Sequence, residues 1–198
     1  LHHIDYENGT IELDGKEYKM LDSNFPTIDP KKPYALTKEE EDIMERLERA
    51  FENCEKLQSH IHFLLNKGGL YKVYNGNLLY HGCVPLKEDG NLKSVRIFGH
   101  TYKGKGLYEV LESYVRKGFY AMDSKEKERG KDIMWYIWLS ENSPLFGKDK
   151  MATFERYFLA EKETHKEKKN PYYLLLEDEK LICHILKEFG LENKDAHI

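Results

Sequence analysis

The sequence predicts an α+β protein that is mostly helical, with two β-hairpins and one long amphipathic helix. Two turn signals, Asp14-Gly15 and Asn75-Gly76, each lie between runs of alternating or aromatic side chains, as in tight hairpins. Between them, apolar residues recur every three or four positions from Ile43 to Leu64, which is the period of one helix face. With 198 residues and 40% hydrophobic content, the chain is long enough for one domain with a real core.

Residues 1–36 are predicted to form a small surface hairpin and an extended connection. Apolar and polar side chains alternate from Gly9 to Met20, on both sides of the first turn signal. Three of the six prolines then fall between Leu21 and Pro33, where fixed φ angles and missing N–H donors favour an extended segment. The helices and hairpins of residues 37–198 are predicted to form one globular unit.

Thr37 is predicted to cap the long helix, because Glu40 follows at the position from which its side chain can bond back to the cap. The apolar stripe continues until Gly68-Gly69, where the helix is predicted to end. We expect this stripe to pack on its own domain; the alternative is a surface for a partner. His60 and His62 are two positions apart, hence on different helix faces, and do not share a metal there.

The second half is predicted to add a strand and three helices. Val95 to Phe98 has strand character, and helical faces follow at 107–115 and 133–138. His100 lies in a segment that we expect to be a hairpin, so we assign it no functional role. The last helix is predicted from Glu177 to Phe189, with Gly190 at its end.

Charge and hydropathy exclude several classes of partner. The formal net charge is −4 and the pI is about 6.2, so there is no basic field for nucleic acid. The longest apolar runs, such as Ile133 to Leu139, are far shorter than the ~20 residues that span a bilayer. Cys54, Cys83 and Cys183 lie in apolar patterns, which indicates buried thiols in a reducing compartment. We predict a cytoplasmic protein that binds neither nucleic acid nor membrane.

The chain contains no Gly-rich phosphate loop, no zinc-binding cysteine pattern and no serine nucleophile elbow. Any catalysis therefore needs metals and assembled ligands, and no catalytic residue is assigned. His81 is the candidate metal ligand, because it follows an apolar strand and precedes Gly82, which would hold the ring rigidly at the strand end. The alternative is a loop histidine or a core histidine with satisfied hydrogen bonds.

Cationic side chains gather in the segment 142–173 of this otherwise acidic chain. They could neutralise a sugar phosphate, where arginine binds bidentately and lysine acts as a point charge. The alternative is a solvated surface loop. The candidate phosphate-binding residues are Lys148, Lys150, Arg156, His165, Lys166, Lys168 and Lys169.

Five runs, in this order, resemble the class III fructose-1,6-bisphosphatases of bacteria and span nearly the whole chain. They are DPKKPYALT, EKLQSHIHFLLNKGGLYKVYNGNLLYHGCVPL, DIMWYIWL, NSPLFGKDKMATFERYF and THKEKKNPYY. The segment that begins at His81 also resembles the fourth motif of the calcineurin-like metallophosphoesterases, in which this histidine binds one of two metal ions. The resemblance implies a phosphoric monoester hydrolase that converts fructose 1,6-bisphosphate to fructose 6-phosphate in gluconeogenesis. It implies two manganese ions, which would clamp the phosphoryl oxygens and lower the pKa of a bridging water.

The family's Asp-x-His, Gly-Asp and Gly-Asn-His motifs are absent from these 198 residues. The resemblance therefore implies an internal piece of a metallophosphoesterase domain, with His81 as one ligand of an incomplete metal site. The expected partners are a sugar bisphosphate and the remainder of the same polypeptide, and a homo-oligomer is left open. We expect the chain alone to be inactive. The alternatives are a non-catalytic helical interaction module and a metallophosphatase for another phosphorylated metabolite.

Overall fold

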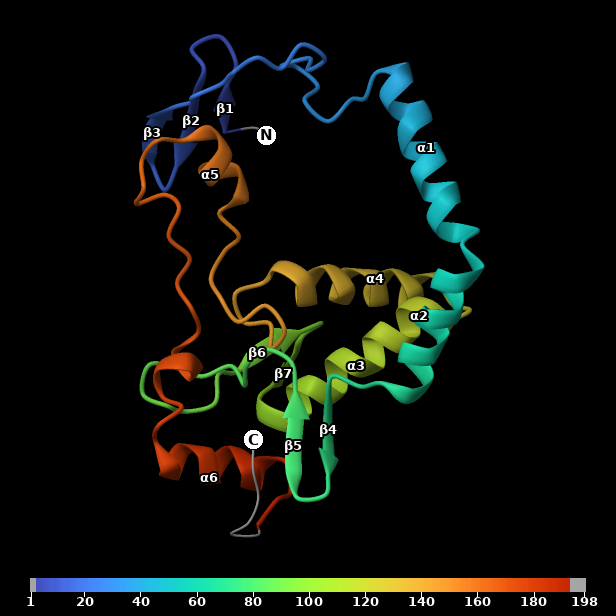
Figure 1. The fold of residues 1–198 in the computed structure, drawn as a ribbon, viewed down its shortest axis with the longest axis vertical. Coiled ribbons are helices and arrows are strands. Elements are labelled where there is room, and N and C mark those ends of the chain that lie inside the picture. Colours follow the sequence, from blue (N-terminus) through green and yellow to red (C-terminus); the bar gives the residue numbers. More distant parts are fainter. Residues whose placement is uncertain (1–2, 193–198) are drawn as a thin grey trace. The chain divides into compact units, whose positions relative to one another are not determined.

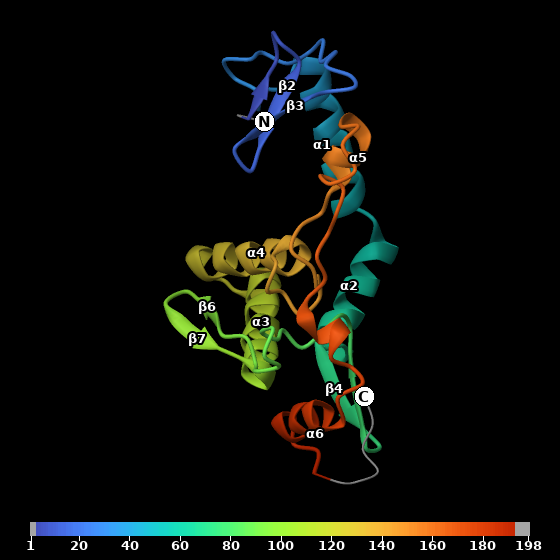
Figure 2. The same cartoon turned by 90° about the vertical axis from the view of Figure 1, so that its left-hand side faces the viewer.

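The computed structural model describes residues 3–192 and shows a mixed α+β fold (Figures 1 and 2). Within these residues the chain forms six α-helices and three small antiparallel sheets, so the α+β class is confirmed. The chain divides into two compact units. Among the described residues, unit 1 comprises residues 3–63 and 152–166, and unit 2 comprises residues 64–151 and 167–192. The predicted boundary after residue 36 stays a prediction.

Unit 1 is built around a three-stranded sheet in the order β1-β2-β3. Strands β2 and β3 pair around the Asp14-Gly15 turn, as predicted. Residues 152–166 return to this sheet, where Leu159 is buried with Ile11 and Met20, and where the N–H of Leu21 donates to the carbonyl of Phe158 at 2.7 Å. The elements of unit 1 are β1 (Ile4–Asp5), β2 (Thr10–Leu13), β3 (Lys16–Lys19), α1 (Lys38–Glu52), most of α2 (Glu55–Lys67) and α5 (Thr153–Phe158).

The predicted long helix is two helices, α1 and α2, so the prediction of one continuous helix is wrong. Its start is confirmed: the N–H of Glu40 donates to Oγ1 of Thr37 at 3.2 Å, and the N–H of Thr37 donates to Oε2 of Glu40 at 2.8 Å. The break comes at Asn53, whose side-chain amide donates to the carbonyl of Arg49 at 2.8 Å. A short polar side chain that bonds to the backbone in this way competes with helical hydrogen bonds and favours a helix end.

The apolar stripe of α1 is exposed, so the expectation that it packs on its own domain is wrong. No residue of α1 or of α2 is buried. We call Ile43, Met44, Leu47 and Phe51 the α1 face; their side chains are between 47% and 64% exposed. A stripe predicts which residues share a face, but the element that covers the face must come from elsewhere in the fold.

The cysteine prediction holds for one residue only. Cys83 is buried, whereas Cys54, between α1 and α2, and Cys183, on α6, are exposed. Helices within residues 3–192 are also too short or too polar for a membrane crossing.

Unit 2 contains two hairpins and a helical layer. The β4–β5 hairpin turns at Asn75 and Gly76, with φ angles of 48° and 75°, as predicted. The His100 segment forms the hairpin β6–β7, as expected for that segment. Together with the sheet of unit 1, the described residues hold three small sheets, whereas the predicted fold class names two hairpins. The elements are β4 (Tyr71–Tyr74), β5 (Asn77–Tyr80), β6 (Val95–Ile97), β7 (His100–Tyr102), α3 (Gly104–Tyr120), α4 (Ser124–Leu139), a 3-10 turn (Pro171–Leu174) and α6 (Glu179–Glu188).

Helix α3 lies between the two hydrophobic cores of unit 2 and crosses α4 (Figure 2). Tyr108 enters the first core, whose buried members include Leu78, Cys83 and Ile185. Leu107 and Leu111 enter the second core together with side chains of β6 and α4. The helix thereby connects the β4–β5 hairpin to α4.

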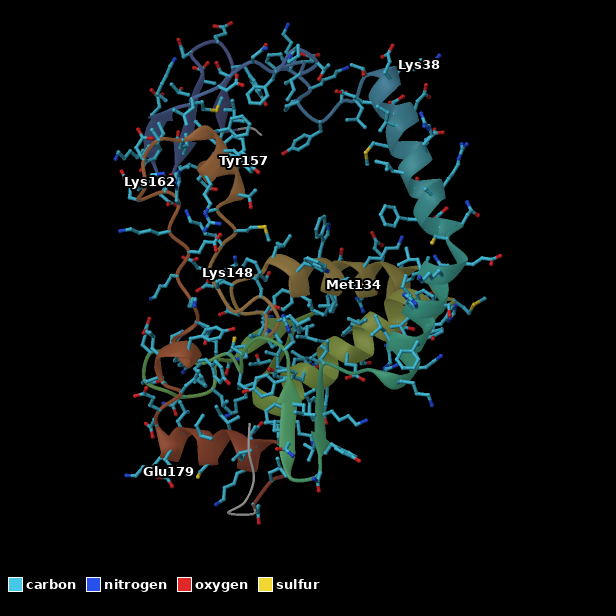
Figure 3. All side chains as sticks on the ribbon, in the orientation of Figure 1. Lys38, Met134, Lys148, Tyr157, Lys162 and Glu179 are labelled. Carbon is cyan, nitrogen blue, oxygen red and sulfur yellow. The ribbon has the colours of Figure 1, made fainter. Side chains whose placement is uncertain are left out.

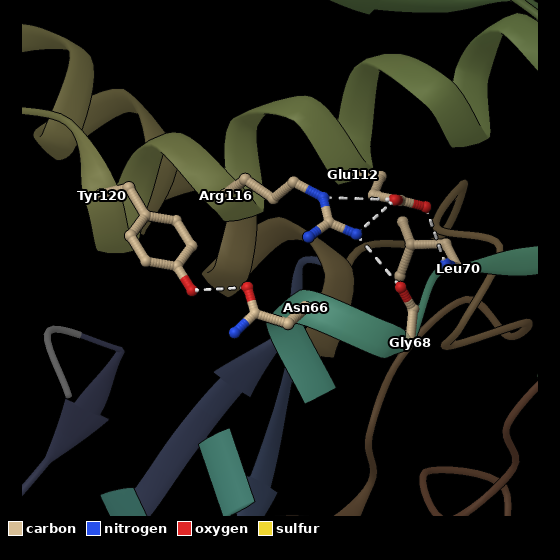
Figure 4. Close-up of polar contacts among 6 residues, drawn as sticks. All are labelled: Asn66, Gly68, Leu70, Glu112, Arg116 and Tyr120. Carbon is tan, nitrogen blue, oxygen red and sulfur yellow. Dashed lines mark hydrogen bonds and ion pairs between the residues drawn. The ribbon is translucent and has the colours of Figure 1, made fainter. Parts of the chain in front are cut away.

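The entry to β4 is fixed by polar contacts from α3 (Figure 4). Arg116 donates to the carbonyl of Gly68 at 3.0 Å and to the carboxylate of Glu112 at 2.7 Å. The same carboxylate accepts the N–H of Leu70 at 3.1 Å. These bonds bind the chain between α2 and β4 to α3, and so fix the hairpin that leads to His81.

Candidate functional site

Three loops of unit 2 meet next to His81. They span residues 81–88, 143–149 and 167–171. The N–H of Cys83 donates to the carbonyl of Pro144 at 2.8 Å, and the N–H of Asn170 donates to the carbonyl of Gly147 at 2.9 Å. The side-chain oxygen of Asn170 accepts the N–H of Leu86 at 3.1 Å, which joins the third loop to the first. We call this region the loop junction.

Gly82 is required by the close approach of two of these loops. Its φ angle is +88°, and a Cβ placed there would lie 2.1 Å from the carbonyl oxygen of Pro144. No side chain fits that space, and L-residues rarely adopt that φ angle. The glycine after His81 therefore has a packing reason, independent of any role for the histidine.

His81 is exposed at the junction and lines a cavity of about 330 Å³. We call this the tryptophan cavity; it is lined by His81, Ile137, Trp138, Leu145, Phe146, Lys148 and Met151. Within residues 3–192, no group of three or more His, Cys, Asp or Glu side chains could hold a metal ion. The described residues therefore do not by themselves fit a two-metal site.

Five lysines line a neighbouring cavity of about 200 Å³. We call it the lysine cavity; its lysines are Lys87, Lys93, Lys148, Lys168 and Lys169, and its carboxylates are Glu88, Glu141 and Asp149. An excess of ammonium groups around a small cavity suits a phosphate. Lys148 lines both cavities, so the histidine and the cations border adjoining spaces.

The wall of the lysine cavity is a short antiparallel pairing of the second and third loops. Lys148 lies opposite Lys169, and the N–H of Asp149 donates to the carbonyl of Lys168 at 2.9 Å. Lys148 follows α4 on the chain (Figure 3). This pairing, between residues about twenty positions apart, places their ammonium groups around one space.

Two of the five lysines pair with carboxylates. Lys148 lies 2.6 Å from Glu167, and Lys168 lies 2.7 Å from Glu88. The hydrogen bond to Glu88 raises the pKa of Lys168, which therefore stays charged. Within residues 3–192, no carboxylate lies within ion-pair distance of Lys87, Lys93 or Lys169. The cavity therefore has an excess of positive charge, with five lysines and the three carboxylates Glu88, Glu141 and Asp149.

Sequence reasoning missed Lys87 and Lys93, because they lie outside the cationic segment. They stand at the two ends of a tight turn that is closed by the N–H of Lys87 donating to the carbonyl of Asn91 at 2.9 Å. The pairing of Leu86 with Leu92 holds the arms of this turn together. The signal that could have found them is the Asp-Gly turn at 89–90, which brings its flanking lysines to one side.

The other predicted cations are distributed over both units. Lys150 does not line the lysine cavity, and Arg156, His165 and Lys166 belong to unit 1. Nε2 of His165 lies 3.0 Å from the carbonyl of Leu159, and Arg156 donates to the carbonyl of His165 at 3.4 Å. Phosphate binding by these four residues stays a prediction.

The polar groups below His81 are structural. Burial raises the pKa of the Cys83 thiol to about 12, so the thiol is protonated near neutral pH. The hydroxyl of Tyr108 donates to the carbonyl of Cys83 at 2.8 Å, and the hydroxyls of Tyr80 and Tyr172 lie 2.5 Å apart. Burial, together with the Tyr172 hydrogen bond, raises the pKa of Tyr80. These neutral bonds stiffen the base of the junction.

A larger, open cavity of about 960 Å³ lies between β4 and α3. Its charges are mostly paired: Lys105 lies 3.7 Å from Glu109, and Lys117 lies 2.6 Å from Glu126. Arg116 pairs with Glu112 in the same way. Because these cations are neutralised in place, this cavity is a weaker phosphate site than the lysine cavity despite its size.

Comparison with known proteins identifies relatives over the full chain. The family model of Firmicute fructose-1,6-bisphosphatase matches residues 1–198. The chain is 52% identical over 200 residues to a class 3 fructose-1,6-bisphosphatase of Listeria innocua, with 98% of this chain and 30% of the relative covered. It is 53% identical over 199 residues to the class 3 enzyme of Clostridioides difficile, with 100% and 30% covered. This chain thus spans about 30% of the length of these relatives. No solved structure matches it significantly.

Proposed function

Because this chain belongs to the Firmicute fructose-1,6-bisphosphatase family, we propose that it forms part of a class 3 fructose-1,6-bisphosphatase. That enzyme hydrolyses fructose 1,6-bisphosphate to fructose 6-phosphate and phosphate, in the cytoplasm and in gluconeogenesis. Within it, these 198 residues belong to the metallophosphoesterase domain and bind the substrate. One observation carries the proposal: Lys148 lines both the lysine cavity and the cavity of His81.

The lysine cavity supplies what binding of a phosphorylated sugar needs. Phosphate esters carry up to two negative charges near neutral pH, and lysine ammonium groups neutralise them as point charges. Lys148 and Lys169 are held opposite each other by backbone pairing, so their side chains start from fixed positions. The cavity volume of about 200 Å³ suits one phosphate group with bound water.

The metals of such an enzyme need ligands beyond the residues described here. Since these residues hold no cluster of three ligands, we propose that His81 provides one neutral imidazole to manganese. The other ligands come from the remainder of a polypeptide of the relatives' length. A ring at an exposed strand end, on a hairpin fixed from below, is suited to that role. The second ring nitrogen would need an orienting acceptor.

The proposal is tested on a polypeptide of the relatives' length that contains these 198 residues, called here the full-length enzyme. We expect it to release phosphate from fructose 1,6-bisphosphate with manganese at ~1 per second or faster. The 198-residue chain assayed in parallel should release none above the uncatalysed rate. Absence of turnover in the full-length enzyme would contradict the assignment. Turnover by the short chain would contradict the proposal that the other metal ligands lie outside these 198 residues. Other phosphorylated metabolites in the same assay test the alternative substrate.

The exposed α1 face supports a second function, that of an interaction surface. Four apolar side chains gather on one side of a capped helix, and none is buried. About 70% of each relative lies outside the matched segment, so we propose the remainder of the same polypeptide as the occupant. Slower amide hydrogen exchange of α1 in the full-length enzyme than in the short chain would support it. Equal exchange rates would contradict it.

A further inference from the structure

We infer that the lysine cavity holds the phosphate that is not hydrolysed, while the sugar lies in the tryptophan cavity and the reacting phosphate lies on its His81 side. This inference rests on the proposed function, and it assigns the two ends of the substrate. It also names Lys87, Lys93 and Lys169 as the residues that recognise the second phosphate.

The side chains of the lysine cavity favour binding over hydrolysis. No histidine lines it, and its lysines are donors without a free lone pair when charged. Two of its carboxylates are engaged: Glu88 pairs with Lys168 at 2.7 Å, and Asp149 accepts the N–H of Lys168 at 2.8 Å. The third carboxylate, Glu141, also lines the cavity and acts through its charge on Lys168. With five lysines and three carboxylates, the cavity favours neutralising a phosphate over activating water.

The tryptophan cavity has the character of a site for the body of a sugar. Its walls are mostly apolar, and Trp138 is 69% exposed, so the ring face is open to a ligand. The carbon-bound hydrogens of a sugar ring can lie against an aromatic face while its hydroxyls stay hydrated. His81 and Lys148 are the two basic side chains among its lining residues.

Lys148 lines both cavities, so one ligand could extend from one cavity into the other. Its ammonium lies 2.6 Å from Glu167 and 5.1 Å from the centre of the Phe146 ring, which lines the tryptophan cavity. A sugar with phosphates at both ends could thus place its middle over Trp138 and one phosphate among the lysines. The other phosphate would then face His81, the candidate metal ligand.

Product inhibition of the full-length enzyme separates the two phosphate positions. Fructose 6-phosphate keeps the phosphate that is not hydrolysed, whereas inorganic phosphate is the group that is released. We expect Lys93→Gln and Lys169→Gln each to raise the inhibition constant of fructose 6-phosphate and the KM of the bisphosphate by about ten-fold, because each removes a charge-assisted contact. The inhibition constant of inorganic phosphate and kcat should stay within about two-fold. Lys180→Gln, at an exposed lysine of α6 that lines neither cavity, is the matched control.

Each other outcome is decisive. If the inhibition constant of inorganic phosphate rises, alone or together with that of fructose 6-phosphate, the lysine cavity does not select the phosphate that is retained and the inference is wrong. If neither changes, the cavity does not bind substrate and the inference is equally wrong, while turnover by the wild-type enzyme leaves the proposed function standing. A wild-type enzyme without activity on the bisphosphate instead refutes the proposed function, and this inference with it. A Trp138→Ala variant should raise the KM of the bisphosphate while its melting temperature stays unchanged, since this side chain is largely exposed.

Discussion

Helix α1 of unit 1 and helix α3 of unit 2 have similar lengths, 15 and 17 residues, but opposite environments. Helix α1 begins with a complete capping box and buries none of its side chains. The N-cap residue of α3, Lys103, makes no side-chain cap hydrogen bond, and the helix buries Leu107, Tyr108 and Leu111. Local signals specify α1, whereas tertiary packing specifies α3. An amphipathic stripe therefore does not say whether, or by what, it is covered.

The same difference separates the two candidate functions. The loop junction lies where unit 2 is densely packed, so its side chains start from fixed positions. The α1 face lies where the described residues offer no cover, so its role depends on contacts from elsewhere. Substitutions of buried or tightly packed residues at the junction and in α3 should therefore affect stability strongly, and substitutions on the α1 face only weakly.

The largest expected effect is at the tightest contact of the junction. Gly82→Ala should lower the free energy of unfolding by about 4 kcal/mol or more, because the new Cβ meets a backbone oxygen that no side-chain movement can clear. Gly99→Ala is the matched control: its φ angle is +91°, but nothing lies within 4 Å of the added Cβ. It should lower the free energy of unfolding by only about 1–2 kcal/mol, because an L-residue is disfavoured at that φ angle. Equal urea midpoints for the two variants would contradict the close approach.

The next effect concerns the packed helix. Leu111→Ala should destabilise the chain by about 2–5 kcal/mol, because Leu111 is fully buried in the second core of unit 2 and its truncation leaves a cavity. Urea unfolding measures the loss. A change below about 1 kcal/mol would mean that the α3 contacts with β6 and α4 are looser than the structure shows.

His81 is expected to behave as a functional residue without a structural role. In the full-length enzyme, His81→Ala should lower kcat by about 100-fold or more, which equals about 2.7 kcal/mol, and should reduce bound manganese. The melting temperature should hardly change, because the side chain is exposed. Unchanged manganese content with a lowered melting temperature would show that the histidine is structural.

The sequence predicts those elements whose signals are local. The two turns at Asp14-Gly15 and Asn75-Gly76 need specific φ angles, and the Thr37 cap needs a partner three positions away, so each is visible in a few residues. The break at Asn53 was not predicted, since asparagine within a strong apolar period is a weak signal until its side chain is seen on the Arg49 carbonyl. The exposure of the α1 face depends on long-range packing, which periodicity does not contain.

The candidate site also has features that the sequence predicts and features that depend on long-range packing. His81 and Lys148 could be singled out from motif and charge, but their adjoining cavities depend on Gly82 packing against Pro144, a contact between loops about sixty positions apart. Lys87 and Lys93 join the lysines of 148–169 for the same non-local reason. Charge along the sequence could not show that Arg156 and Lys166 belong to a different unit.

The smallest expected effect lies on the α1 face and gives the sharpest contrast with Leu111. In the 198-residue chain, Leu47→Ala should change the free energy of unfolding by less than about 0.5 kcal/mol, because the side chain is 47% exposed and leaves no cavity. In the full-length enzyme the same substitution should cost about 2 kcal/mol or more if the remainder of the polypeptide covers this face. Urea unfolding of both proteins, with Leu111→Ala in each as the reference, measures the difference. A large loss in the short chain would mean that the α1 face is already packed there, and a small loss in both would mean that the rest of the polypeptide does not bind it.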